Sequence, residues 1–256
     1  MMTHFTYASA ISAVLLLQGC ASLRASEPPL FQPDAIGHNY VVVDGDTVAV
    51  SFLPPDESLR HGRLTERDFE EVASELGVEV AAIKAVTEIE AGRTHEGFWT
   101  EGKPLINFDL GVYRARAARR GINLKKYAGS HSVIFNRPNT ARYGSQQAAQ
   151  QARLDAAMAI DSISAIEGTF WGMFQIGGFN YARCGTSSHS DFVRLMSRSE
   201  RDQLDLFARF IRNAGLLPAL RKKDWRTFAR GYNGPSYAAR GYHTRLASSY
   251  AKHSKK

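Results

Sequence analysis

The hydrophobic pattern divides the chain into an apolar leader, a short alternating segment and a long helical region. From residue 64 onward, apolar residues recur every three or four positions, the period of a helix that buries one face. After a helix bounded by Thr65 and Gly77, the pattern predicts helices over residues 78–90, 110–120, 146–159, 191–196, 200–213, 225–229 and 237–251. This region is long enough to bury a sizeable core. We therefore expect one mainly α domain over residues 64–252.

Local signals support the first helical boundaries. Thr65 followed by Asp68 is a variant capping box, with Asp in the usual Glu or Gln position, and Gly77 is typical of a helix stop. The next helix should end before Gly92. The short, apolar, proline-containing segment 103–109 suits an extended conformation instead.

An alternating segment precedes the helices. Residues 40–43 and 46–52 are rich in valine and flank Asp44-Gly45, a strong signal for a two-residue β-turn. Pro54 and Pro55 follow. We assign residues 39–63 to a small N-terminal β-hairpin and its linker. Residues 20–38 contain three prolines without helical periodicity and are interpreted as a tether.

The first residues have the properties of an export signal. Residues 1–19 contain no Lys, Arg, Asp or Glu, and the apolar run 8–17 is too short to span a bilayer. The run ends at Leu17-Gln18-Gly19-Cys20, which resembles the lipobox of bacterial lipoproteins. This resemblance implies a signal peptide over residues 1–19, acylation of Cys20, and a periplasm-facing lipoprotein of the cell envelope. By the same analogy Ala21 favours the outer membrane, while plain secretion and a buried N-terminal helix remain alternatives.

The amino-acid composition limits the classes of partner that we expect for this protein. The net charge of +7 and the isoelectric point of about 9.5 favour contact with anionic surfaces such as cell wall or acidic lipid. Nucleic acid is not an expected partner, because no helix-turn-helix, zinc or aromatic-basic signature accompanies the charge. The eight histidines show no metal-ligand spacing, so we expect neither a metal nor a cofactor. Cys184 lies beside no obvious base and is expected to be a small buried side chain.

One acid stands out on the helix over residues 78–90. Glu90 continues the apolar stripe formed by Ile83 and Val86, which predicts a carboxyl group against apolar neighbours. Such surroundings raise a carboxyl pKa, as a general acid requires at neutral pH. The alternative is an exposed helix-end residue. Glu88 lies about 200° around the helix, four residues after Lys84, and is expected to pair with it on a solvated face.

Two glycine-flanked segments carry amides and aromatic rings suited to holding a sugar. Residues 171–176 contain Gln175, and residues 230–235 contain Tyr232 and Asn233, which we expect to lie in loops. Trp99 is expected either to stack on a sugar or to join the core. Two further acids, Glu96 and Glu101, are alternatives to Glu90.

Several of these motifs resemble the N-acetylmuramidase family of phage endolysins and bacterial wall-lytic proteins. The similarity rests on residues 64–65, 84–92, 104–109, 171–181 and 225–235 and covers about residues 64–250. It implies a lysozyme-like α-helical domain that binds peptidoglycan glycan strands. It also implies cleavage of the β-1,4 bond between N-acetylmuramic acid and N-acetylglucosamine, with Glu90 as catalytic acid and Gln175, Tyr232 and Asn233 as substrate-binding residues. A more distant similarity to goose-type lysozymes and lytic transglycosylases has the same motif order.

The chain departs from these relatives at two positions. Ala91 replaces the Ser that usually follows the acid in the distant relatives, and Asp109 stands where a Glu is expected in the closer family. Asp109 is the candidate second carboxylate, with a helix cap before residue 110 as its structural alternative. The sequence leaves open a hydrolase, a lytic transglycosylase that forms anhydro ends, and a weakly active peptidoglycan-binding lipoprotein.

Overall fold

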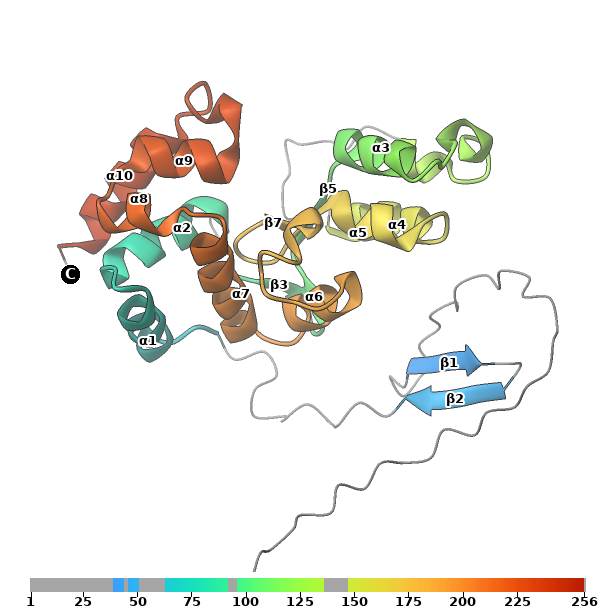
Figure 1. Cartoon of the computed structure of the whole chain (residues 1–256), viewed down its shortest axis with the longest axis horizontal. Helices are drawn as coiled ribbons and strands as arrows, with labels where there is room; N and C mark the ends of the chain where they lie inside the picture. The colour runs from blue at the N-terminus through green and yellow to red at the C-terminus, as the bar shows by residue number, and fades with distance from the viewer. Residues whose placement is uncertain (1–38, 44–45, 51–62, 92–95, 136–146, 256) are drawn as a thin grey trace, which may run out of the picture. The chain divides into compact units, whose positions relative to one another are not determined.

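The computed structural model describes residues 39–43, 46–50, 63–91, 96–135 and 147–255, and the chain separates into two compact units at residues 54 and 55. In the first unit, β1 (Asn39–Val43) pairs antiparallel with β2 (Asp46–Val50), with Val41 opposite Val48 (Figure 1). This confirms the two strands of the predicted hairpin. Its turn, the leader, the tether and the linker over residues 51–62 lie outside the described residues.

The second unit is mainly helical, as predicted (Figure 1). Its helices are α1 (Glu66–Leu76), α2 (Val80–Glu90), α3 (Leu110–Arg119), α4 (Gln147–Met158), α5 (Ser162–Glu167), α6 (His189–Met196), α7 (Glu200–Asn213), α8 (Leu217–Arg221), α9 (Trp225–Asn233) and α10 (Tyr242–His253). Short 3-10 turns cover η2 (Leu124–Tyr127), η3 (Ser132–Phe135), η5 (Gly178–Asn180) and η6 (Pro235–Tyr237). The short helices α5 and α8 were not predicted.

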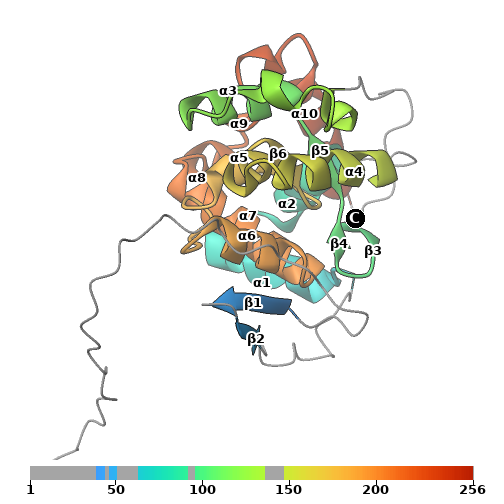
Figure 2. The same ribbon diagram turned by 90° about the vertical axis from the view of Figure 1, so that its right-hand side faces the viewer.

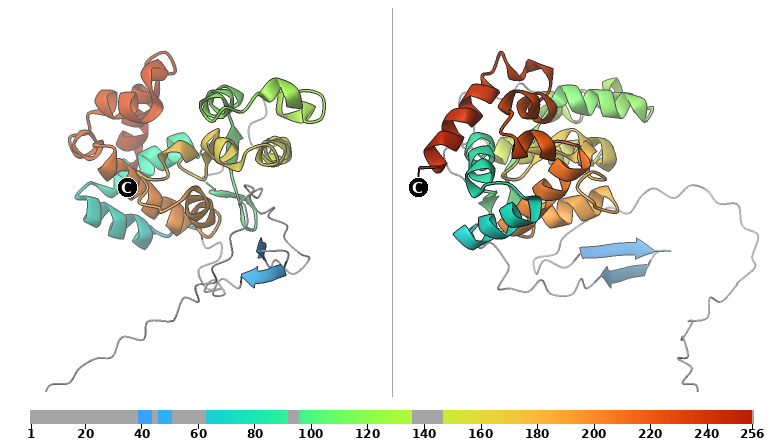
Figure 3. Two further views of the ribbon diagram at one scale, coloured as in Figure 1. Left: turned by 45° about the vertical axis from the view of Figure 1, so that its right-hand side comes forward. Right: turned by 60° about the vertical axis from the view of Figure 1, so that its left-hand side comes forward.

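The capping signals at α1 act as expected. Thr65 accepts a hydrogen bond from the Asp68 backbone, Asp68 accepts one from the Thr65 backbone, and Gly77 ends the helix with φ of 61°. α10 packs along α2 (Figure 3). Among the described helices, none is long and apolar enough to cross a membrane.

α9 is longer than predicted. Asp224 caps its start, and the helix continues through Gly231 to Asn233 before Gly234, with φ of 78°, ends it. The prediction of a loop over residues 230–233 is therefore wrong. A side chain on Gly231 would meet Leu216 at 2.3 Å, so this glycine serves helix packing rather than a loop. α10 begins later than predicted, because η6 and Gly241, with φ of 65°, precede it.

A small antiparallel sheet lies among the helices (Figure 2). β5 (Ile106–Phe108) pairs with β6 (Thr169–Trp171), which pairs with β7 (Ile176–Gly177). A separate hairpin joins β3 (Phe98–Thr100) to β4 (Lys103–Pro104), so the segment predicted to be extended is extended. The free edge of β5 is covered by α4: the Gln147 amide exchanges bonds of 2.9 and 3.0 Å with the Ile106 backbone.

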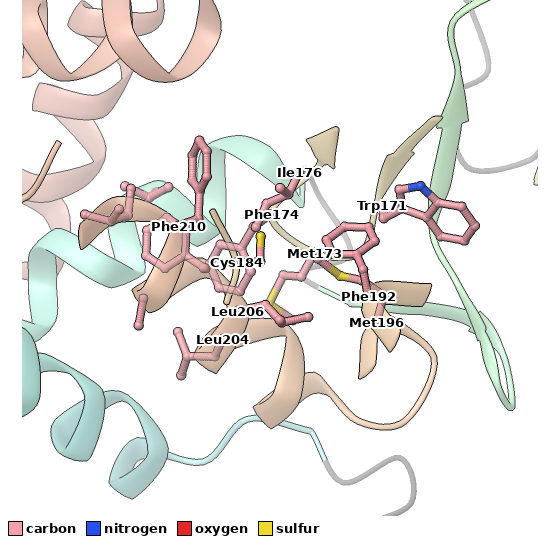
Figure 4. Close-up of a cluster of buried hydrophobic side chains, with 14 of the residues drawn as sticks. Trp171, Met173, Phe174, Ile176, Cys184, Phe192, Met196, Leu204, Leu206 and Phe210 are labelled. Atoms are coloured by element: carbon pink, nitrogen blue, oxygen red, sulfur yellow. The ribbon is translucent and has the colours of Figure 1, made fainter. Parts of the chain in front are cut away.

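The core connects this sheet to the central helices. The turn between β6 and β7 inserts Met173 and Phe174 into the core (Figure 4). Phe174 stacks on Phe207 of α7, with the ring centres 4.4 Å apart. Cys184 is fully buried in the same cluster, as expected, and burial raises the pKa of its thiol to about 12. The turn is thus anchored by apolar packing.

Candidate active site

Glu90 is the last residue of α2 and is half-buried. Ile83 and Val86, on the same face of the helix, are fully buried, so the apolar stripe leads to this carboxyl group as predicted. Burial raises the pKa of Glu90 to about 7, although a hydrogen bond from Asn233 and the charge of Arg245 act in the opposite direction. A carboxyl group with this pKa exchanges its proton near neutral pH.

Asn233 contacts this acid directly. It is the last residue of α9, and its Nδ2 donates a hydrogen bond of 2.8 Å to Oε1 of Glu90. The other end of the amide, Oδ1, is buried and accepts no hydrogen bond from the described residues. The ends of α2 and α9, 143 residues apart in the sequence, therefore place the Glu90 carboxyl group beside an amide whose oxygen can still accept a hydrogen bond.

Glu88 behaves differently from the expectation. Lys84 pairs with Glu66 of α1 at 2.5 Å, so the predicted pair with Glu88 is wrong. Instead, Glu88 accepts hydrogen bonds from Ser249, Lys252 and His253 of α10. Burial opposes ionisation, but these bonds prevail and lower the pKa of Glu88 to about 2. Two acids two residues apart thus have opposite properties: the pKa of Glu88, which fixes α10 to α2, is lowered, whereas the pKa of Glu90 is raised.

Gln175 lies in the turn between β6 and β7. Gly172 begins this turn with φ of 69°, and Gln175 itself has φ of 46°, a conformation uncommon for a residue with a side chain. Gln175 Nε2 donates to the Gly172 carbonyl at 2.8 Å. Its side chain is half-buried, whereas residues 171–174 and 176–178 are buried, so the turn exposes this amide selectively.

Tyr232 supports the turn. Its hydroxyl donates to the Phe174 carbonyl at 2.6 Å, and Phe228 stacks against its ring at 5.5 Å. The rings of Phe207 and Phe210 also approach it edge-on. These contacts give Tyr232 a positioning role, and the predicted contact of its ring with a sugar stays a prediction. Because Asn233 follows Tyr232 directly, the turn with Gln175 is tied to the helix end that contacts Glu90.

α7 contributes two buried polar residues that the sequence reasoning missed. Glu200 accepts hydrogen bonds from the Leu64 and Gly97 backbones at 2.9 and 2.8 Å. Gln203, fully buried, accepts from Met173 N at 2.7 Å and donates to the Gly97 and Met196 carbonyls. The sequence does contain a signal for this role, because Gln203 interrupts the apolar stripe of its helix.

Gln203 also explains why residues 97 and 172 are glycines. A Cβ atom on Gly97 would lie 2.4 Å from its Oε1, and one on Gly172 would lie 2.7 Å from its Cδ. The amide therefore fills the space between the strand β3 region and the turn that carries Gln175. Both segments are held by backbone hydrogen bonds to one side chain.

Asp109 occupies the helix-cap position. Its Oδ1 accepts from Val112 N at 2.9 Å at the start of α3, and its own backbone N–H donates to the Gly168 carbonyl. The helix-cap contact expected as the structural alternative is therefore present, and a role as second carboxylate stays a prediction. No hydrogen bond between Asp109 and Glu90 is present in the described structure.

The remaining aromatic and acidic candidates lie on or near the β3–β4 hairpin. Glu96 forms an ion pair with Arg63, and Glu101 is exposed. Trp99 is 39% exposed, with the Lys103 ammonium 5.9 Å from its ring centre, so the core alternative is wrong and stacking on a sugar stays a prediction. Across the described residues, no group of three or more His, Cys, Asp or Glu side chains could hold a metal ion.

Comparisons with known proteins agree with this arrangement. The crystal structure of Burkholderia AP3 phage endolysin matches with a TM-score of 0.64 and 33% sequence identity, over 78% of this chain and 76% of that one. A search of curated proteins found no match. The family model for N-acetylmuramidase matches residues 79–254, a range that includes Glu90, Gln175 and Asn233. The chain belongs to the N-acetylmuramidase family.

Proposed function

We propose that Glu90 is the general acid of a muramidase that cleaves the β-1,4 bond between N-acetylmuramic acid and N-acetylglucosamine. Family membership and the likeness to an endolysin support peptidoglycan hydrolysis by a lysozyme-type glycoside hydrolase. The observation that carries the residue assignment is the half-buried Glu90 carboxyl group, with a pKa of about 7, beside the Asn233 amide.

The proton transfer follows from this geometry. With a pKa of about 7, a substantial fraction of Glu90 is protonated at neutral pH and can protonate the bridging oxygen as the muramyl C1 becomes oxocarbenium-like. Glu90 becomes negative in this step. The Asn233 N–H and the Arg245 charge then stabilise the carboxylate. The same groups therefore limit the rise of the pKa and assist the loss of the proton.

A second group must stabilise the sugar centre or orient water. Asp109 is engaged as the cap of α3. Asn233 Oδ1 is a buried acceptor adjacent to Glu90, and we assign it to an N–H or O–H donor of the bound substrate or of the attacking water. Gln175 offers a second amide for a sugar hydroxyl or acetamido group.

A zymogram with muropeptide analysis tests this assignment. Glu90→Gln removes the proton donor at nearly unchanged volume and should abolish clearing of peptidoglycan. Glu101→Gln is the matched control, because it neutralises an exposed acid and should clear like the wild type. Equal clearing by Glu90→Gln would exclude Glu90, and absence of clearing by the wild type would favour a peptidoglycan-binding lipoprotein.

The released fragments distinguish the two enzymatic routes. Reducing muramyl ends indicate hydrolysis. Anhydro ends indicate attack by the muramyl C6 hydroxyl, as in a lytic transglycosylase. Mass spectrometry separates these products because they differ by one water molecule.

We further propose that the protein is a lipoprotein of the bacterial envelope, facing the periplasm and held in the outer membrane by lipid on Cys20. The support is the uncharged leader over residues 1–19 and the small residue before Cys20. Metabolic labelling with a fatty acid, followed by membrane fractionation, tests it. Label that persists in Cys20→Ala would contradict lipidation at this residue.

A further inference from the structure

An open pocket of about 340 Å³ lies between the last turn of α2 and α10. Its wall combines apolar surface with hydroxyl groups and charged side chains. The lining residues include Glu88 and Ile89 from α2, and Thr244, Arg245, Ser248 and Lys252 from α10.

The charges in this pocket are not equivalent. The Glu88 carboxylate is satisfied by Lys252 and His253, with bonds of 2.9 and 2.7 Å. Arg245 is exposed and forms no ion pair within the described part of the chain. Its guanidinium lies 5.5 Å from the centre of the Tyr242 ring. The pocket therefore retains one cation that forms no ion pair among the described residues and lies against an aromatic ring.

The pocket adjoins the proposed catalytic acid. Ile89, in its wall, directly precedes Glu90, and the charge of Arg245 acts on the Glu90 carboxyl group. A ligand held by Arg245 would thus lie beside the residue that cleaves the glycan. Peptidoglycan differs from an uncharged glycan by its stem peptides, which carry carboxylates close to each muramyl residue. A guanidinium binds a carboxylate through two parallel hydrogen bonds, and neighbouring hydroxyl groups add donors.

We propose that this pocket binds a carboxylate of the peptidoglycan stem peptide, with Arg245 as its principal cation. The proposal rests on the proposed muramidase function and adds a site that recognises the peptide rather than the sugar. Arg245 then selects peptide-bearing glycan and positions its muramyl unit for Glu90.

Binding to insoluble peptidoglycan tests the site without relying on cleavage. In the Glu90→Gln background, co-sedimentation is compared for native peptidoglycan and for peptidoglycan whose carboxylates have been converted to amides with carbodiimide and ammonia. Arg245→Ala should weaken binding to the native material about two- to fivefold, the size expected for one exposed charge pair. On the amidated material, the proteins with and without Arg245 should bind alike.

Two further variants sharpen the result. Arg245→Lys keeps the charge but lacks the planar fork, and should recover part of the binding. Arg119→Ala removes an exposed arginine of α3 that has no ion pair in the described structure, and should leave binding unchanged. Unchanged binding by Arg245→Ala, or an equal loss on native and amidated material, would overturn the proposal.

The outcome is separable from that of the proposed function. Clearing by Glu90→Gln in the zymogram would refute Glu90 as the acid. Selective loss of binding to unmodified peptidoglycan depends on Arg245 alone. For the active enzyme, Arg245→Ala should raise KM on native but not on amidated peptidoglycan, whereas the change in kcat caused by the lost charge near Glu90 should be the same on both materials.

Discussion

Replacing Asn233 with alanine should move the alkaline limit of activity to higher pH. The Asn233 N–H bonds Oε1 of Glu90 at 2.8 Å and favours the ionised carboxylate, which lowers the pKa set by burial. Without this donor, Glu90 should retain its proton at a higher pH. A general acid works only when protonated, so activity should persist further into the alkaline range even as its maximum falls.

The size of the shift follows from the strength of the bond. A hydrogen bond to a charged group contributes about 1.5–3 kcal/mol, and one pKa unit corresponds to about 1.36 kcal/mol. The full bond would therefore shift the pKa by about one to two units. Glu90 is half-buried, so water replaces part of the lost bond, and we expect about one unit. The alkaline midpoint should thus move from near pH 7 to near pH 8.

Dye release from labelled peptidoglycan, measured as kcat/KM from pH 5 to 9 at constant ionic strength, reports the pKa of the free enzyme. Asn213→Ala is a matched control, because that amide bonds the Arg183 carbonyl instead of Glu90. Its profile should coincide with the wild type. An alkaline limb that stays in place, or moves to lower pH in Asn233→Ala, would refute the assignment of this limb to Glu90.

Three further predictions test other parts of the structure. The pKa of Glu90 rises from 4.5 to about 7 on folding, so ionising this group costs up to about 3 kcal/mol of stability as the pH rises through this window. Glu90→Gln should therefore unfold at a higher temperature than the wild type at pH 8, and the difference should be smaller at pH 4.5. Asp109→Asn should preserve the α3 cap and full activity. Asp109→Ala should lower the free energy of unfolding by about 1 kcal/mol in denaturant and keep the pH profile of activity. A large loss of kcat in Asp109→Asn would instead indicate that Asp109 is the second carboxylate. Gln203→Ala leaves the buried Met173 N–H without its partner and removes one of the two hydrogen bonds to the Gly97 carbonyl, so it should lower the free energy of unfolding by about 2–4 kcal/mol, measured by urea denaturation.

The sequence predicts the longer helices well because their signals are local. The Thr65–Asp68 capping box and the left-handed Gly77 require only neighbouring backbone groups. The stripe that leads to Glu90 also survives folding, since a face buried by tertiary packing must repeat with the helical period. Short helices such as α5 (Ser162–Glu167) span too few turns to show this period.

The interaction partners of a side chain are harder to predict from sequence than the helices and strands themselves. Lys84 and Glu88 have the spacing of a helical ion pair, but α1 and α10 supply each with a different partner. Such pairs contribute only a few tenths of a kcal/mol, so tertiary contacts readily replace them. Tyr232 illustrates the same limit: a glycine-flanked aromatic suggests a ligand, whereas its hydroxyl and ring are used by the core.

The proposed site depends on how separate elements are held together. α2 provides the acid, α9 provides the amide that contacts it, and the β6–β7 turn provides Gln175. Tyr232 ties the turn to α9, and Gln203 ties it to the segment that contains Gly97. Both tethers act on the turn's backbone and involve no hydrogen bond to Glu90. Their substitution should therefore reduce the rate by displacing Gln175, while the pH at which Glu90 releases its proton changes less than in Asn233→Ala.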